Sequence, residues 1–224
     1  MTDPNALIRL LHLVSPSLPT GAYSYSQGLE WAVEAGWISD ETSLEDWLAC
    51  LARQSLGRVD IPLLTRMYAA VKDNQPDELK KWCLLLLACR ETSELREEEK
   101  TRGKAMATLL QRLNLPGIDR FNNSLQSSQL AGFAFAAAGW NIPLTDASSG
   151  YIWAWLENQV LTGMKIIPLG QSSGQQLLVK LTEPIPQIVK HGLQLGDEEI
   201  GASSPALALA GSHHETQYTR LYRS

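Results

Sequence analysis

The stretch that decides the fold is PDELKKWCLLLLACRETSELREEEKTRGKAMATLLQRL, residues 76–113, the longest helical pattern in the chain. Pro76 opens it, because a proline in the first turn of a helix loses no hydrogen bond. Steps of three and four residues through the stretch meet apolar side chains at both ends and charged ones in the middle: Leu84, Ala88, Glu91, Leu95, Glu98, Arg102, Ala105 and Leu109. The pattern predicts helix on both sides of a break near Thr92–Ser93.

The charged middle of that stripe is unusual, because a lone amphipathic helix keeps its buried face apolar. A carboxylate buried without a partner would cost too much free energy to persist. Glu98 and Arg102 have the spacing and the order that favour an ion pair along a helix. We therefore expect either an internal polar network or a surface that meets a partner, formed by Glu91, Glu94, Glu98 and Arg102. A solvated face on a kinked helix is the alternative interpretation.

The rest of the chain repeats the helical pattern between proline- and glycine-rich breaks. Helices are predicted at 4–13, at 24–36, after a capping box formed by Thr42 and Glu45, from Asp60 and Pro62, and at 125–139. Further helices are predicted from a cap at Ser148–Ser149 to about 167, at 175–190 with a break at Pro184 and Pro186, and from Pro205. The breaks fall at 15–21, 141–146, 168–170 and 192–204. With neither a period-two pattern nor an internal repeat, the sequence predicts a single all-α domain over residues 1–224, a bundle of roughly eight to ten helices.

Composition narrows the class of protein. The 224 residues carry a net charge of −5, which argues against a nucleic-acid partner. The longest apolar run, Trp82 to Cys89, is far shorter than the roughly 20 residues that span a bilayer, and the N-terminal residues lack the features of an export signal. The three cysteines form no CxxC pair. We expect a reduced, cytoplasmic protein without a membrane partner.

Motifs that carry catalysis are missing from the sequence. There is no GxSxG turn, no Walker A sequence and no GxGxxG after a strand, so we predict no catalytic residue and no enzyme activity. The adjacent His213, His214 and Glu215 are weak candidates for a metal site, because imidazole suits nickel. Neighbouring residues on a helix point about 100° apart, however, which makes joint chelation difficult. We expect surface histidines and no tightly bound cofactor.

Four polar clusters stand out instead. They are SPSLPTGAYSYSQGLE (15–30), CRETSELREEEKTRG (89–103), WLENQVLTGMKIIPLGQ (155–171) and SHHETQYTRLYRS (212–224). The last is rich in tyrosine and arginine, the residues that concentrate binding energy at protein interfaces. This predicts a C-terminal partner-binding tail at about 212–224, with a frayed terminus as the alternative.

In these four clusters, in their order along the whole chain, the sequence resembles the family of urease accessory protein F. The segments 112–125 and 192–204 carry no recognisable family signature. The resemblance implies an all-helical homodimer that binds urease accessory protein D, called H in some organisms. It implies that this complex recruits the nickel-carrying GTPase, urease accessory protein G, and engages apo-urease, so that nickel passes through the complex.

The resemblance also implies roles for individual residues. Tyr23 and Arg220 match positions that build the surface recruiting the GTPase, and Lys165 matches the family lysine on that face. We expect Arg220 to bond the Tyr23 hydroxyl or a backbone carbonyl and so to order the tail. The expected partner-binding residues are Tyr23, Gln27, Glu30, Lys165, Gln171, His214, Glu215, Tyr218, Arg220, Tyr222 and Arg223.

Two other functions remain open from sequence. The first is a metallochaperone that holds nickel with His213, His214 or Glu215. The second is an activator that inserts Arg220 or Arg223 at the γ-phosphate, a device worth about 10³–10⁵ in rate where it operates. The direction of any effect on the GTPase is not specified by the sequence.

Overall fold

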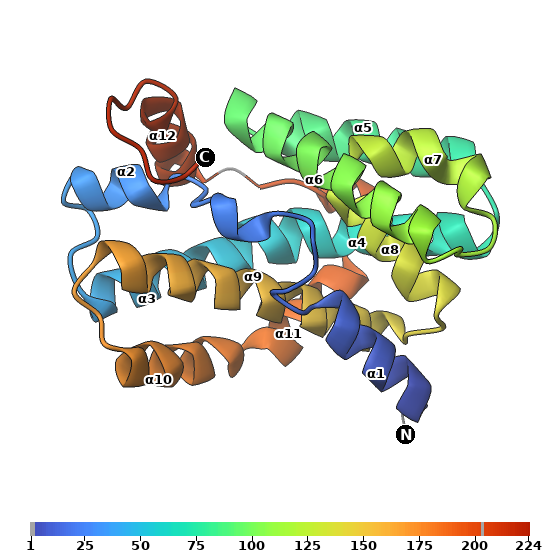
Figure 1. Ribbon diagram of the computed structural model, residues 1–224, viewed down its shortest axis with the longest axis horizontal. Coiled ribbons are helices and arrows are strands. Elements are labelled where there is room, and N and C mark those ends of the chain that lie inside the picture. Colours follow the sequence, from blue (N-terminus) through green and yellow to red (C-terminus); the bar gives the residue numbers. More distant parts are fainter. Residues whose placement is uncertain (1–2, 203) are drawn as a thin grey trace.

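A computed structural model describes residues 3–202 and 204–224, and every regular element in that part of the chain is helical. The elements are α1 (Pro4–Leu13), η1 (Ala22–Ser24), α2 (Leu29–Glu34), α3 (Glu41–Leu51), η2 (Ala52–Asp60), α4 (Ile61–Lys72), α5 (Pro76–Cys89), α6 (Ser93–Arg112), α7 (Ile118–Ser127), α8 (Gln129–Gly139), α9 (Leu144–Ile166), α10 (Gln171–Thr182), α11 (Ile185–Gln194), η3 (Asp197–Glu199) and α12 (Pro205–His214). Figure 1 shows α5, α6 and α7 grouped at one end and α2, α3, α10 and α12 at the other. The predicted all-α, single-domain fold is confirmed.

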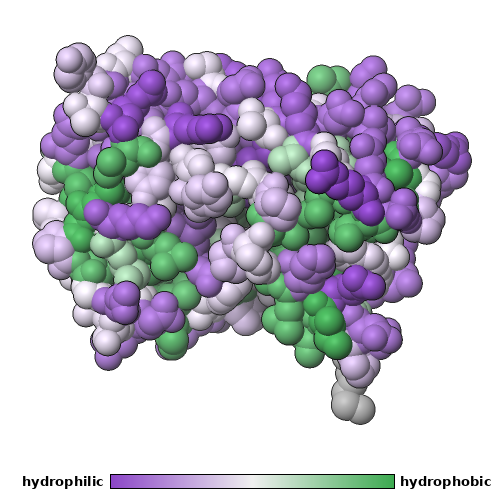
Figure 2. Space-filling model, in the orientation of Figure 1, coloured by the Kyte–Doolittle hydropathy of each residue, from purple (hydrophilic) through white to green (hydrophobic). Residues whose placement is uncertain are grey.

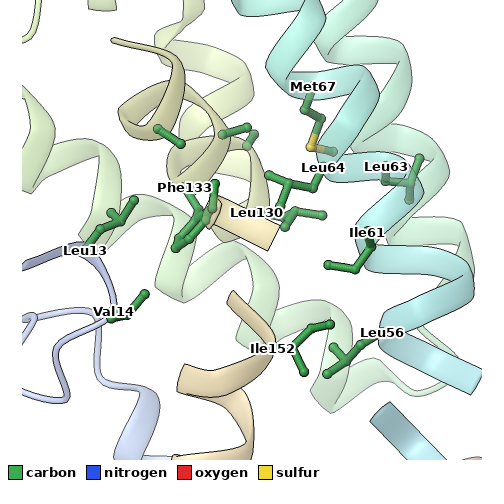
Figure 3. Close-up of a cluster of buried hydrophobic side chains, with 14 of the residues drawn as sticks. Leu13, Val14, Leu56, Ile61, Leu63, Leu64, Met67, Leu130, Phe133 and Ile152 are labelled. Atoms are coloured by element: carbon green, nitrogen blue, oxygen red, sulfur yellow. The ribbon is translucent and has the colours of Figure 1, made fainter. Parts of the chain in front are cut away.

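The centre of the bundle is α8, whose residues are buried from Gln129 to Ala138. Figure 3 shows Leu130 of this helix beside the apolar side chains of α4, and Phe133 on the side toward Leu13. Small residues allow the neighbouring helices to approach closely: a Cβ placed on Gly132 would lie 2.6 Å from the Met106 side chain of α6. The alanine- and glycine-rich sequence therefore serves close packing, which burial of apolar surface stabilises.

The break inside residues 76–113 lies where the sequence predicted it. Helix α5 ends at Cys89, and Arg90 and Thr92 have extended backbones before α6 begins. The Thr92 hydroxyl accepts a hydrogen bond from the Leu95 amide at 3.2 Å, so Thr92 is the N-cap of α6. This turn directs the charged middle of the stripe into the molecule.

Other predicted helix boundaries are wrong. The capping box of α3 is formed by Asp40 and Ser43 instead of Thr42 and Glu45, because the Asp40 carboxylate accepts from the Ser43 amide at 2.9 Å. Ser148 and Ser149 lie inside α9, which begins directly after Pro143. In each case a neighbouring residue supplied a better helix start.

Further differences concern continuity. The predicted helix 24–36 is shortened to α2, because Gln27 and Gly28 have positive φ angles of 55° and 79°. Helix α4 begins directly after Asp60 and carries Pro62 in its first turn, as predicted, but it continues without a break from α3 and the π-helical η2. The predicted helix 125–139 is divided at the extended Ser128. The break predicted at Pro184 and Pro186 is confirmed, because α10 ends at Thr182 and α11 begins at Ile185.

Apolar side chains also reach the surface. Leu7, Ile8 and Leu11 of α1 are exposed, and Figure 2 shows hydrophobic surface in the region of this helix. Within the described ranges, no helix is both long and apolar enough to cross a membrane.

Candidate functional site

The C-terminal segment is bound to the body of the protein by Glu30. This glutamate lies in the first turn of α2, where the helix dipole favours a negative charge, and only 8% of its surface is exposed. One carboxylate oxygen accepts a hydrogen bond from the Leu221 amide at 2.7 Å, and the other accepts from the Tyr222 amide at 3.0 Å. A single buried side chain thus fixes the backbone of two consecutive tail residues.

His214 joins this anchor to α6. It is the last residue of α12 and is fully buried, with Nδ1 2.7 Å from a Glu94 oxygen and Nε2 3.4 Å from a Glu30 oxygen. Carboxylate oxygens accept hydrogen bonds, so a ring nitrogen of His214 that carries a proton donates to the carboxylate it faces. Glu94 also receives Arg220 Nη1 at 2.6 Å. We call Glu30, Glu94 and His214 the tail clamp.

The last residue has its own anchor. The main-chain oxygen of Ser224 accepts hydrogen bonds from the Ser26 amide at 2.7 Å, the Gln27 amide at 2.8 Å and the Ser26 hydroxyl at 2.5 Å. The Ser224 hydroxyl lies 3.1 Å from a Glu98 oxygen, and the residue is 3% exposed. Figure 1 shows α12 and the C-terminus near α2. The segment is therefore ordered at its very end.

Gln27 connects the tail to the interior. Its side-chain nitrogen donates to Glu98 at 2.9 Å, and its side-chain oxygen accepts from the Trp155 indole at 2.7 Å. Glu98 in turn forms an ion pair with Arg102 at 2.7 Å. Of the four residues expected to form an internal network, Glu98 and Arg102 lie at its centre, Glu94 belongs to the tail clamp, and Glu91 accepts from the Ser204 amide.

A second buried ionic group was not predicted from the sequence. Arg90 lies 2.7 Å from Asp60 and 3.1 Å from Glu99. Glu99 also accepts from the Ser128 hydroxyl at 2.9 Å and the Leu130 amide at 3.0 Å. Burial alone would raise the pKa of Glu99, but Arg90 and these hydrogen bonds outweigh it and hold the pKa below its ordinary value.

Both ionic groups line a cavity of about 170 Å³, called here the polar cavity. Its walls come from the 13–23 segment, η2, α6 and α9. Tyr23 and Lys165, distant in sequence, both line it. Mixed apolar and convergent polar walls are typical of binding sites.

The expected partner-binding residues divide into two kinds. Glu30, His214 and Tyr222 are buried and hold the tail in place. The second kind is exposed: Tyr23, Lys165, Gln171, Glu215, Tyr218, Arg220 and Arg223. Gln27 is half-buried. Leu221, which the sequence analysis did not single out, is 75% exposed. Arg220 pairs with Glu94, whereas the expectation was the Tyr23 hydroxyl or a backbone carbonyl.

The three candidate nickel ligands are directed to three different neighbours. His213 stacks on Trp31 with ring centroids 4.5 Å apart, and His214 is enclosed in the tail clamp. Glu215 accepts hydrogen bonds from the Ser93 amide and hydroxyl at 2.8 and 2.6 Å, at the start of α6. In the part of the chain that the structure describes, no group of three or more His, Cys, Asp or Glu residues is arranged to hold a metal ion.

Fold and site together define an all-helical protein with an ordered C-terminal segment and a polar cavity beside it. The model of the UreF family matches residues 38–182. The chain is 48% identical to the urease accessory protein UreF of Pseudomonas entomophila over the full length of both chains. It is 46% identical to that of Alcanivorax borkumensis, covering 98% of this chain and 99% of the relative, and 41% identical to that of Escherichia coli O157:H7 over the full length of both. The chain belongs to the UreF family of urease accessory proteins.

Proposed function

We propose that this protein is a non-catalytic scaffold in the maturation of the urease nickel centre. It works as a homodimer in the cytoplasm, where its free cysteines stay reduced. Together with accessory protein D or H, it recruits and regulates the nickel-delivering GTPase, accessory protein G, on apo-urease. Nickel passes through this complex without a tight site on the chain. Family membership and the anchored tail support the proposal.

The anchored tail is the observation that carries the proposal. Residues 221–224 are held by the buried acceptors Glu30 of α2 and Glu98 of α6, and by donors in the loop before α2. Tyr218, Leu221 and Arg223 nevertheless expose their side chains. Because the backbone is already ordered, a partner that binds these side chains does not bear the entropy cost of ordering it. Tyrosine and arginine are also the residue types that dominate interface energies.

Tyr23 and Lys165 extend this surface toward the polar cavity. Tyr23 is 67% exposed, and its neighbour Ser24 accepts the Arg223 amide at 2.9 Å. Loop and tail are therefore parts of one surface. This arrangement supports a single docking area for the GTPase that includes both sequence clusters.

The test is recruitment of the GTPase by a purified complex of this protein with accessory protein D. We expect a chain truncated before Thr216 to lose recruitment while its helicity and its binding to accessory protein D persist. A milder variant, Leu221→Ala, should weaken recruitment without touching the clamp. Its matched control is Leu84→Ala on α5, which is also exposed, at 60%. Full recruitment by the truncated chain would refute the proposed role of the tail.

A further inference from the structure

One carboxylate on the wall of the polar cavity lacks a counterpart. Glu157 lies on α9, is half-buried and lines the cavity. Burial raises the pKa of its carboxyl group. Among the residues that the structure describes, none forms an ion pair or hydrogen bond with it. Partial burial disfavours the charged form of this carboxyl group, and an opposite charge nearby would favour it.

Both arginines of the cavity are already paired with carboxylates. Arg90 pairs with Asp60 and Glu99, and Arg102 pairs with Glu98. The lining holds five carboxylates, Asp60, Glu91, Glu98, Glu99 and Glu157, but only three cations, Arg90, Arg102 and Lys165. Lys165 follows Glu157 by eight residues, a rise of about 12 Å along the helix, so it does not neutralise that carboxylate. The cavity is therefore short of positive charge at Glu157.

The surroundings of Glu157 suit a long side chain. Leu161 follows one helical turn later, also lines the cavity and is 38% exposed. The Asn158 amide donates to the Tyr25 main-chain oxygen at 3.4 Å, which places the loop carrying Tyr23 beside this part of α9. Lysine and arginine lay their aliphatic stems on apolar surface, and their charged ends bind carboxylates and aromatic faces.

We propose that the polar cavity receives a lysine or arginine side chain from the GTPase, with Glu157 as its ion-pair partner. The inference rests on the proposed function and adds the chemistry of the contact. A protein side chain fits better than a metal ion, because Asp60, Glu98 and Glu99 already bind arginines. In the described part of the chain, no group of three or more metal-ligating side chains is arranged to hold an ion. A side chain also uses the apolar wall, which an ion does not.

The experiment measures the affinity of the GTPase for the complex with accessory protein D. We expect Glu157→Gln, which keeps the shape and removes the charge, to weaken binding about tenfold, and Glu157→Lys to weaken it further. The control Glu183→Gln removes an exposed carboxylate that does not line the cavity and should leave the affinity unchanged. Wild-type affinity of Glu157→Gln would overturn the inference.

A charge exchange identifies the partner group. Single Lys→Glu and Arg→Glu variants of the GTPase are tested against the Glu157→Lys complex, and one of them should restore binding. If none does, or if Glu157→Gln impairs retention of Ni²⁺ by the complex and leaves GTPase affinity intact, the inference is wrong. The truncated chain is assayed in parallel. If truncation abolishes recruitment of the GTPase while Glu157→Gln keeps wild-type affinity, the scaffold function is supported and only the proposed contact at Glu157 is refuted.

Discussion

Replacing Glu30 by glutamine tests how the tail is held. Glutamine has the same shape but keeps only one acceptor oxygen, whereas the glutamate accepts from both Leu221 and Tyr222 and faces His214. A hydrogen bond to a charged group contributes about 1.5–3 kcal/mol. Loss of one such bond lowers the free energy of opening the tail by that amount. At 1.4 kcal/mol per factor of ten, opening becomes about 10- to 150-fold more frequent.

Hydrogen exchange of the isolated protein, read by mass spectrometry on peptides covering 216–224, measures this opening directly. Amides of α8 should exchange as in the wild type, because the core is not altered. Glu34→Gln is the matched control: Glu34 lies on the same helix and accepts from Gln217 of the same tail, but it is exposed, so its loss should change exchange little. Equal exchange of the tail in Glu30→Gln and in the wild type would refute the reasoning.

Three further predictions concern other parts of the molecule. Equilibrium dialysis at micromolar free nickel should find no bound metal. Stoichiometric nickel binding that disappears in His213→Ala would instead favour the metallochaperone function. Because the pKa of Glu99 is lowered in the folded state, its ionised form stabilises the protein fully above the unfolded pKa of about 4.3, and this stabilisation is lost as the pH falls through the folded pKa. In urea unfolding between pH 7 and pH 3, the free energy of unfolding of Glu99→Gln should therefore decrease less at low pH than that of the wild type. An equal decrease would contradict the assignment. Burial raises the pKa of the Cys83 thiol to about 12, so alkylation of the native protein should modify the exposed Cys50 and spare Cys83, as mass spectrometry can verify.

The parts of the fold that were predictable are those with local causes. Helical periodicity, and the prolines and glycines between helices, depend on near neighbours in the chain. The break before α6 was visible because threonine at position 92 can cap a helix. The start of α3 was misplaced for the same kind of reason, since Asp40 and Thr42 both have capping side chains and it is Asp40 that forms the capping box with Ser43.

The candidate site was predictable only in part, because its contacts join distant segments. Glu98 and Arg102 are four residues apart, so their pairing could be inferred. The group formed by Asp60, Arg90 and Glu99 joins η2, the turn between α5 and α6, and α6, so it leaves no periodic pattern in the sequence. Likewise, the sequence marks residues 15–30 and 212–224 as unusual, but it does not separate side chains that hold the tail from those that face outward.

The two anchors of the tail constrain its length more strictly than its composition. His214 is fixed between two carboxylates and Ser224 is fixed on Ser26, so the nine residues 215–223 must span a set distance. Most side chains in this span are exposed and can be exchanged without disturbing either end. Insertion or deletion of one residue, by contrast, shifts every amide relative to Glu30 and releases one anchor. Among homologues, we expect this segment to vary in sequence at its exposed positions and to conserve its number of residues.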